Sequence, residues 1–498
     1  MYERARLRRM DGWLKPLYDA GGIRAIDRWA IEGQGVPSAQ LMEAAGTALA
    51  EAVAELAPQG PVRIVCGKGN NGGDGQIAAR RLRGMGFEVE AVDLWSDRVP
   101  ADLDAWLAGA GAVVDAIFGT GFAGAPRQPA AAAIEAINRC GAPVVACDIA
   151  SGVDASSGEV EGLAVEADLT VSFHAAKLGQ WIAPGKWHTG ELRVIPIGIP
   201  PGAPEEPAGG AIDPAVLSLP PRRGPRSTKF SSGQVTIAGG SRGLTGAVRM
   251  SSLAAIRAGA GYATVAVPAD LEPVFEAGEP EVMSVGCPGG DGCLAPAAAK
   301  AVLRSFDRAA AGVLGPGMGR DPGSVELARE VIGAIAAPLV IDADGLNAFA
   351  GQLERIAARR APTVLTPHAG ELGRLLGRDA EEIAAHRLAA TREAATAAGA
   401  VVVLKGDDTI VSDGERVAVN ALSAPALATA GSGDVLSGMV AALLARGLEP
   451  FAAACAAVLA HARAGRDAAA RIGAAESVIA TDVIASIPVG LRADEPVE

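Results

Sequence analysis

The residues from Pro61 to Gly75 read PVRIVCGKGNNGGDG, an apolar run that leads into a glycine-rich turn. The run has the length and β-branched content of a buried strand, and a helical pattern follows the turn. Gly67, Gly69 and Gly72 give the spacing G-x-G-x-x-G, which is typical of a dinucleotide-binding turn between a strand and a helix. Two asparagines and an aspartate also stand in this turn, where such turns usually keep small apolar residues. By itself the spacing fits a nucleotide site and equally an ordinary turn, because asparagine beside glycine suits a positive φ.

The alternation of short apolar runs with helical patterns continues along the whole chain. Continuous β-branched runs predict strands that are buried on both faces, and therefore mostly parallel sheets covered by helices. Eight prolines lie between Pro200 and Pro225 with almost no periodic pattern, which favours a linker. The predicted fold class is α/β, with two tandem domains of which the first is Rossmann-like. We expect the first domain over residues 1–199, the linker over 200–225 and the second domain from 226.

Composition excludes several classes of function. The 498 residues carry a net charge of −13 and no long basic run, so a nucleic-acid partner is not expected. No stretch of about 18 uncharged apolar residues occurs, so no membrane span is expected. Six scattered cysteines have neither metal spacing nor a disulfide pattern, which favours a reduced, cytoplasmic protein. Five dispersed histidines leave little room for a catalytic zinc site.

Polar residues of the first half collect where strands are predicted to end. Asn71 and its neighbours follow the first strand, Asp115 lies on the third, and Asp148 and Ser151 close the next one. Ligands bind at the carboxyl ends of strands in open parallel sheets. An aspartate at a strand end is more often a structural cap than a catalyst, but here three polar strand ends share one layer. Oxygens of Asn71, Asp115 and Ser151 would suit a hard cation.

Three separated segments of this half, GKGNNGGDGQIAARRL, VDAIFGTGFAG and DIASGVDASSG, resemble the YjeF N-terminal domain, the NAD(P)H-hydrate epimerase family. The resemblance covers roughly residues 20–199. It implies potassium at Asn71, Asp115 and Ser151, and Asp148 as the acid/base group that inverts C6 of the hydrated nicotinamide ring. The substrate contacts that it implies are Asn70, Asn71, Gly72, Gly73, Asp74, Gly119, Thr120, Gly121, Phe122, Ala123, Gly124, Ala125 and Asp148.

The most informative segment of the second half is ATAGSGDVLSGMVAALLARG, residues 428–447. Gly431 and Gly433 flank Ser432, Asp434 follows, and a helical pattern begins at once. Backbone amides at a helix N-terminus bind phosphate oxygens, and an aspartate behind them can accept a proton from an attacking hydroxyl. The alternative is a purely structural role as a helix cap, because aspartate is favoured near helix starts. No Walker A sequence is present, so the P-loop class is excluded.

The segments DADGLN, TPHAGE, LKGDDTIV and AGSGDVLSG look like the ADP-dependent NAD(P)H-hydrate dehydratase branch of the ribokinase-like superfamily. The resemblance covers about residues 226–489. One departure is STKFSSG, residues 227–233, where the family has a histidine before the lysine. The resemblance implies Asp434 as the base for phosphorylation of the C6 hydroxyl, and loss of phosphate then restores the dihydronicotinamide. The implied hydrate contacts are Ala247, Gly317, His368 and Asp434, and the implied nucleotide contacts are Lys405, Gly406, Asp407, Asp408, Thr409 and Gly433.

The two resemblances together imply a bifunctional NAD(P)H-hydrate repair enzyme. We expect potassium, Mg²⁺ and ADP or ATP as phosphoryl donor, small-molecule substrates, and a homo-oligomer. One alternative is a kinase for a vitamin precursor or sugar fused to a nucleotide-sensing domain. Another is a binding protein without catalysis, against which the intact Gly-Ser-Gly-Asp turn argues. The sequence leaves open ADP against ATP and NADH hydrate against NADPH hydrate.

Overall fold

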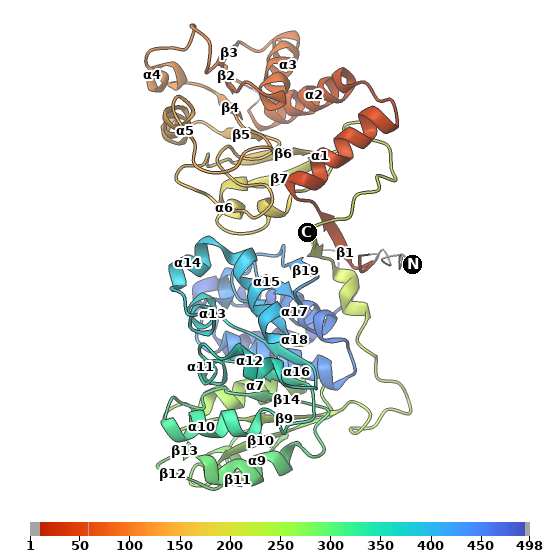
Figure 1. Cartoon of the computed structure of the whole chain (residues 1–498), viewed down its shortest axis with the longest axis vertical. Coiled ribbons are helices and arrows are strands. Elements are labelled where there is room, and N and C mark those ends of the chain that lie inside the picture. The colour runs from red at the N-terminus through yellow and green to blue at the C-terminus, as the bar shows by residue number, and fades with distance from the viewer. Residues whose placement is uncertain (1–9, 58, 494–498) are drawn as a thin grey trace. The chain divides into compact units, whose positions relative to one another are not determined.

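The computed structural model describes residues 10–57 and 59–493, and these divide into two compact units (Figure 1). Unit 1 contains residues 16–210, and unit 2 contains residues 11–15 and 211 onwards. The expected α/β class with two tandem, mainly parallel domains is confirmed. In the described part of the chain, no helix is long and apolar enough to cross a membrane.

Unit 1 has one six-stranded sheet in the order β3-β2-β4-β5-β6-β7, in which every neighbouring pair is parallel. Side chains alternate between the faces of a strand, so Ile64 packs in one core cluster and its neighbour Val65 in another. Helices α2 and α3 cover the first face, and α4 and α5 cover the second. The strands are β2 (Val62–Cys66), β3 (Val89–Asp93), β4 (Ala112–Ala116), β5 (Val144–Cys147), β6 (Leu169–Phe173) and β7 (Glu191–Ile195). The helices are α1 (Ala20–Arg28), the π-helical turn Trp29–Gly33, α2 (Ser38–Leu56), α3 (Asn70–Gly84), α4 (Leu103–Leu107), α5 (Ala130–Arg139), the 3-10 turn Leu178–Gln180 and α6 (Gly185–Thr189).

Unit 2 is built on a larger sheet with the order β1-β8-β19-β18-β17-β16-β15-β14-β9-β10-β11. The pairs from β11 to β17 are parallel, whereas β17, β18 and β19 pair antiparallel. The strands are β1 (Leu14–Leu17), β8 (Gly209–Ile212), β9 (Gln234–Ala238), β10 (Tyr262–Pro268), β11 (Val282–Cys287), β14 (Ala311–Leu314), β15 (Leu339–Ile341), β16 (Thr363–Leu365), β17 (Val401–Leu404), β18 (Ile410–Ser412) and β19 (Val417–Val419), with a separate short hairpin of β12 (Gly289–Gly290) and β13 (Cys293–Leu294).

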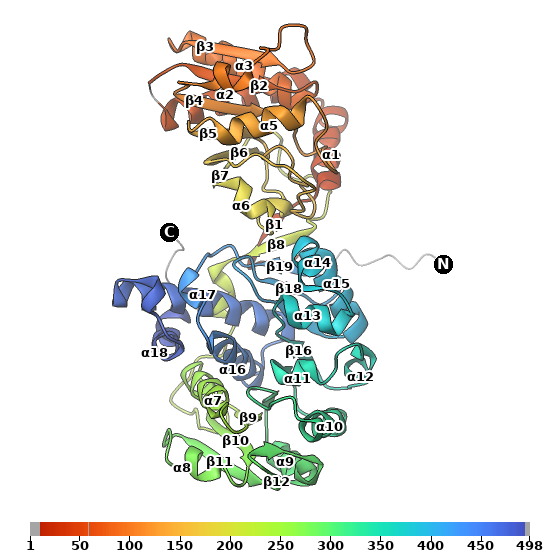
Figure 2. The ribbon, with the colours of Figure 1, turned by 90° about the vertical axis from the view of Figure 1, so that its left-hand side faces the viewer.

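Helices cover both faces of the larger sheet (Figure 2). Helices α9, α10, α13 and α15 share a core cluster with the strands, while α7, α16, α17 and α18 pack together on the other side. The helices are α7 (Thr245–Arg257), α8 (Glu272–Glu276), α9 (Ala299–Phe306), α10 (Pro322–Val331), α11 (Asp344–Asn347), α12 (Leu353–Ala357), α13 (Ala369–Leu376), α14 (Ala380–Ala385), α15 (Arg387–Ala398), α16 (Ser432–Ala445), α17 (Pro450–Ile472) and α18 (Ala480–Gly490). Short 3-10 turns lie at Pro214–Ser218, Pro296–Ala298, Pro425–Leu427 and Ala475–Ser477.

The structure differs from the expected linker over residues 200–225. Residues 209–212 form β8, and Pro214–Ser218 form a 3-10 turn that begins with proline, where its fixed φ is tolerated. The prolines therefore flank a short strand, which lies between β1 and β19 in the larger sheet, instead of excluding one. The first strand, β1, was not expected, because its residues LKPL form a segment too short to show a strand period.

Candidate functional site

A cavity of about 680 Å³ opens at the carboxyl ends of the unit 1 strands. The loops after β2, β3, β4 and β5 line it, together with residues of α1 and α2. Eight of the predicted substrate contacts line this cavity: Asn70, Asn71, Asp74, Gly119, Thr120, Gly121, Phe122 and Asp148. The predicted contacts Gly72, Gly73, Ala123, Gly124 and Ala125 are not among the residues that line it.

Gly72 serves the turn itself. A Cβ at this position would stand 1.9 Å from the carbonyl oxygen of Gly67, so only glycine allows the first turn of α3 to close against the end of β2. Helix α3 begins at Asn70 with Gly69 as its cap, and residues 69–71 line the cavity. The first amides of a helix have no carbonyl partner within the helix, so they favour an anionic group.

Asp148 is held in an unusual backbone conformation at the end of β5, with φ at 65°. Its carboxylate accepts a hydrogen bond from the amide of Phe173 at 3.1 Å and forms an ion pair with the fully buried ammonium of Lys177. Lys177 also donates to the hydroxyl of Ser172 at 2.8 Å. An aspartate in the left-handed region is strained, and the surrounding contacts hold it there. Asp148 therefore presents a fixed, charge-paired carboxylate to the cavity.

Lys177 was missed by the sequence reasoning. It lies 29 residues after Asp148, in the loop after β6, and nothing in the local pattern links the two positions. The signal that was available is a lone lysine shortly after the buried strand β6, since a buried lysine needs a partner.

Two further carboxyl groups of the cavity are hard to ionise. Burial raises the pKa of Asp74 to about 8, and the charges of Asp148 and Asp27 add to the effect. The pKa of Asp27, on α1, is raised by burial and then by Asp148, while Lys177 opposes the shift. A carboxyl group with a pKa of about 8 carries a proton at neutral pH and can donate it. Asp27 was also missed, because α1 has the periodicity of an ordinary amphipathic helix.

The three residues predicted to bind potassium are brought together by the structure. The Ser151 hydroxyl donates to Asp115 at 2.6 Å, and the Ser151 amide donates to the other carboxylate oxygen at 2.8 Å. The side-chain amide of Asn71 donates to the carbonyl oxygen of Phe118 at 2.9 Å, and the Phe118 amide donates to the Ser151 hydroxyl at 2.8 Å. This network gathers carboxylate, hydroxyl and main-chain carbonyl oxygens beside the end of β4.

Asp115 is completely buried, and burial raises its pKa to about 6 although Ser151 and the amide of Ile117 donate to it. In the part of the chain that the structure describes, the groups that donate to Asp115 are neutral. A buried carboxylate with no positive partner is costly, and a bound monovalent cation would remove that cost.

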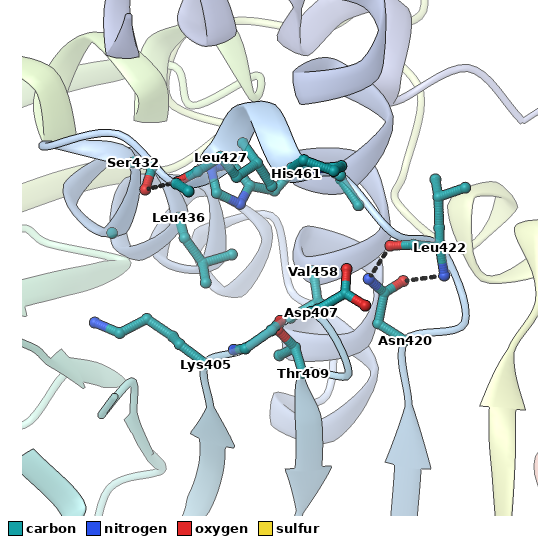
Figure 3. A pocket seen from close by; sticks show the side chains of 16 residues that line it. Lys405, Asp407, Thr409, Asn420, Leu422, Leu427, Ser432, Leu436, Val458 and His461 are labelled. Carbon is teal, nitrogen blue, oxygen red and sulfur yellow. Dashed lines mark hydrogen bonds between the residues drawn. The ribbon is translucent and has the colours of Figure 1, made fainter. Parts of the chain in front are cut away.

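A second cavity, of about 280 Å³, lies in unit 2 (Figure 3). The loop 405–409 after β17, the residues before α16 and one side of α17 enclose it. Five of the predicted nucleotide contacts line it: Lys405, Gly406, Asp407, Thr409 and Gly433. Asp408 is not among the lining residues; its carboxylate is buried and pairs with the Arg387 guanidinium at 2.7 and 2.8 Å. Arg387 also donates to the carbonyl oxygen of Lys405 at 3.3 Å, so the Arg387–Asp408 pair stabilises the conformation of the loop 405–409.

One end of the unit 2 cavity is suited to an anion. Helix α16 begins at Ser432 after Gly431, whose φ of 88° turns the chain into the helix. A Cβ on Gly433 would stand 3.3 Å from the ammonium nitrogen of Lys405. Amides at the start of the helix and a lysine therefore lie close together, which suits an anionic group.

Carboxylates surround Lys405 on its other side. Its ammonium lies 3.2 Å from Asp342 and 3.5 Å from Glu371, and these charges raise its pKa although burial opposes the shift. Burial raises the pKa of Asp434 to about 7, Asp342 adds to the shift, and Lys405 opposes it. Asp434 thus has the pKa expected of a base that works near neutral pH.

The predicted hydrate contacts lie outside the 280 Å³ cavity. Gly317 and Ala247 are neighbours, because a Cβ on Gly317 would stand 3.1 Å from that of Ala247. His368 caps α13: its Nδ1 accepts from the Gly370 amide at 3.0 Å, and the Glu371 side chain accepts from the His368 amide at 2.9 Å. His368 therefore has the structural role of a cap, and its Nε2 lies 3.5 Å from the Glu371 carboxylate that Lys405 also contacts.

His461 on α17 lines the cavity of about 280 Å³ and was not predicted (Figure 3). Its ring is almost fully buried, and its Nε2 has no hydrogen-bond partner in the described part of the chain. Burial lowers the pKa of His461 to about 4, and the nearby Lys405 lowers it further, so the ring is neutral at pH 7. An unpaired buried nitrogen in a cavity is where a ligand atom is expected.

Comparisons with known proteins match both halves of the chain. A family model described as NAD(P)H-hydrate dehydratase matches residues 235–489, and one described as YjeF-related protein N-terminus matches residues 38–108 and 92–179. Bifunctional NAD(P)H-hydrate repair enzymes from Salinibacter ruber and Moorella thermoacetica are each 37% identical to the chain; the first match covers 95% of both chains and the second 96%. A solved ADP/ATP-dependent NAD(P)H-hydrate dehydratase from Bacillus subtilis, co-crystallised with ATP and Mg²⁺, is 27% identical over 55% of this chain and 94% of that chain, with a TM-score of 0.47. The chain belongs to the family of bifunctional NAD(P)H-hydrate repair enzymes.

Proposed function

We propose that unit 1 interconverts the R and S hydrates of NADH and NADPH at C6, and that unit 2 uses an adenine nucleotide to dehydrate the S hydrate. The observation that carries the first part is the charge-paired Asp148 in the cavity at the strand ends. The second part is carried by Asp434 on the first turn of α16, beside the amides and lysine suited to phosphate. The alternative of a small-molecule kinase fused to a sensor is not favoured, because both halves match the repair family.

In unit 1, inversion requires the bond from C6 to its hydroxyl oxygen to break and a water to add to the opposite face. The ring nitrogen can share its lone pair with C6 while the oxygen is away. Asp74, protonated at neutral pH, can donate the proton that leaves with the hydroxyl, and Asp148 can accept one from the incoming water. Lys177 holds Asp148 in place and balances its charge.

In unit 2, Asp434 accepts the proton of the C6 hydroxyl as its oxygen attacks the terminal phosphorus of the nucleotide. The amides at the start of α16 and Lys405 stabilise the charge on the transferring phosphoryl group. Phosphate, a better leaving group than hydroxide, then departs from C6, and loss of a ring proton restores the dihydronicotinamide. Lys405 to Thr409 and Gly433 are proposed to hold the nucleotide, with Ala247, Gly317, His368 and Asp434 at the hydrate.

Two cations belong to the proposal. Asn71, Asp115 and Ser151 would hold potassium, because they offer an all-oxygen site around a buried carboxylate with no cationic partner among the described residues. Potassium would supply the positive charge that fixes the loop at the end of β4. In the described residues, no group of three or more His, Cys, Asp or Glu residues is arranged to hold a metal. We therefore propose that Mg²⁺ enters with the nucleotide phosphates, as it commonly does. The choice between ADP and ATP as phosphoryl donor stays open. The homo-oligomer and the cytoplasmic location stay predictions.

The test follows the absorbance of dihydronicotinamide. Purified protein is mixed with a mixture of R and S NADH hydrates, Mg²⁺, potassium and either ADP or ATP. Full recovery of the absorbance is expected from the parent, because epimerisation feeds the S hydrate to unit 2. Asp148→Asn should recover only the S fraction at the fast rate. A parent that recovers only the S fraction would refute the role of unit 1, and one that phosphorylates without recovery of absorbance would refute that of unit 2.

A further inference from the structure

An aromatic wall of three side chains, Trp95, Phe118 and Phe122, lines one part of the unit 1 cavity. The rings of Phe118 and Phe122 are stacked with centroids 4.4 Å apart, and the ring of Trp95 lies 6.3 Å from that of Phe118. The ammonium of Lys68, which also lines the cavity, lies 5.3 Å from the centroid of the Trp95 ring. The wall thus combines flat apolar surface with one exposed cation.

The strand order places the Trp95 end of this wall away from Asp148. Trp95 follows β3, and the two phenylalanines follow β4, whereas Asp148 follows β5. Because the order is β3-β2-β4-β5, three strand spacings of about 4.8 Å, or about 14 Å, lie between the ends of β3 and β5. That span is comparable to the length of an extended dinucleotide. The start of α3 and the loop Gly119–Gly121 lie between the two ends of the cavity.

We propose that the aromatic wall binds the adenine ring of the hydrated dinucleotide, and that Lys68 binds the phosphate on the 2′ position of the adenosine ribose. The proposal rests on the epimerase function proposed above. The hydrated nicotinamide has a tetrahedral C6 with a hydroxyl group, so it lacks the flat face that stacking requires, whereas adenine is planar. C6 must also reach Asp148, which places the other end of the dinucleotide at the wall. The wall then binds both substrates, and Lys68 favours the hydrate of NADPH over that of NADH.

The stacking part is tested with Trp95→Leu, with Trp187→Leu as the matched control because Trp187 is exposed on unit 1 and does not line the cavity. Stacking of a base on an aromatic side chain contributes about 1–3 kcal/mol, so KM for the NADH hydrate should rise about tenfold while kcat stays within about twofold. The hydrate of reduced nicotinamide mononucleotide lacks adenosine. For this shorter substrate the loss in kcat/KM should stay below about twofold. An equal loss with both substrates would overturn the proposal, because the wall would then contact the nicotinamide half.

The Lys68 part is tested by equilibrium binding, which does not depend on turnover. Calorimetry compares ADP-ribose with its 2′-phosphate on the parent, on Lys68→Gln and on Arg127→Gln, an exposed residue that does not line the cavity. In Lys68→Gln, the affinity for the phosphorylated ligand should fall about fivefold or more, and the affinity for ADP-ribose should fall by less than about twofold. Added salt should reduce the difference between the two ligands. Equal weakening of both ligands, or no weakening, would overturn the role of Lys68. Tight binding of both ligands by a parent that does not epimerise would refute the function and leave the adenosine site standing.

Discussion

Asp434 illustrates how one side chain can satisfy both a structural rule and a chemical one. Its position in the first turn of α16 is favourable for any acidic residue, yet its carboxylate is also beside Lys405 and Asp342. In Asp434→Asn, the backbone amides proposed to bind phosphate remain while the proposed proton acceptor is lost. Dehydration of the S hydrate should fall about 10²-fold or more, with nucleotide affinity within about threefold of the parent. Absorbance assays measure the rate of dehydration, and titration with nucleotide measures the affinity. If nucleotide binding collapses as well, Asp434 builds the anion site and is no base.

The same residue predicts a pH dependence. A base must be deprotonated, and the pKa of Asp434 is raised to about 7 by burial and by Asp342. The kcat/KM of dehydration should therefore fall as the pH drops through about 7, approaching tenfold per pH unit on the acid side. The folded-state pKa is raised, so ionisation opposes folding: the contribution of Asp434 to stability is full below its unfolded pKa and is lost as pH rises through about 7. A flat profile between pH 5.5 and about 8 would contradict the assignment.

Lys177 allows a test of the buried ion pair in unit 1. Removal of one partner of a buried pair leaves an unpaired charge and typically costs about 3–5 kcal/mol of the free energy of unfolding. Lys177→Met should therefore raise amide hydrogen exchange in β5 and β6 strongly in the full chain. The double variant Asp148→Asn with Lys177→Met removes both charges and should recover most of the protection. Arg98→Met, at an exposed loop position of the same unit, is the control. If Lys177→Met has the same protection from amide hydrogen exchange as the parent, the Lys177–Asp148 ion pair is not a stabilising contact.

At the scale of elements, the packing of α16 against α7 fixes the anion end of the unit 2 cavity. A Cβ on Gly438 would stand 2.0 Å from the carbonyl oxygen of Ser251, so no side chain fits between the two helices. Gly438→Ala should force the helices apart and lower the melting temperature of unit 2 by several degrees, with weaker nucleotide binding. Gly246→Ala on α7 is the matched control, because its Cβ would meet nothing within 4 Å and helix propensity favours alanine. Calorimetry measures the melting temperature of both variants, and equal values would contradict the role of Gly438.

The elements also show what sequence reasoning can reach. Strands such as β2 and β4 and the helices α3 and α16 follow from apolar runs and glycine turns, because local chemistry specifies them. Three site residues were not predicted from the sequence: Lys177, Asp27 and His461. Their place in a site depends on contacts between segments that are distant in the sequence. β1 was missed because LKPL is too short for a period to show and because its neighbour in the sheet, β8, is distant in the sequence. Asp408 matched the motif, but its contact with Arg387 of α15 draws it away from the cavity.

At the scale of the whole molecule, unit 2 takes part of its structure from the start of the chain. Residues 11–15 belong to it although residues 16–210 form unit 1. Trp13 packs on Phe451, with ring centroids 6.0 Å apart, and Arg416 lies 4.2 Å from the centroid of the same Phe451 ring. Arg416 also pairs with Asp11 at 3.3 Å and with Glu449 at 2.8 Å. A cut between the two halves of the sequence therefore does not reproduce the division between the two units.

This arrangement predicts the behaviour of a fragment that begins at residue 208. We expect it to fold, because every strand of its sheet except β1 and both helical layers are its own. It should melt at a lower temperature than unit 2 in the full chain, since β1 and the Trp13 contact are missing. A synthetic peptide of residues 10–18 should restore part of the loss. Its effect should grow with concentration as RT ln(1 + [L]/Kd), which is about 2.7 kcal/mol at a hundredfold excess over Kd. A peptide with Trp13→Ala and Asp11→Asn should have a much smaller effect. Equal melting temperatures for the fragment and for unit 2 in the full chain would show that residues 11–15 contribute nothing to its stability, and a fragment that stays unfolded even with the peptide would refute the division into two units.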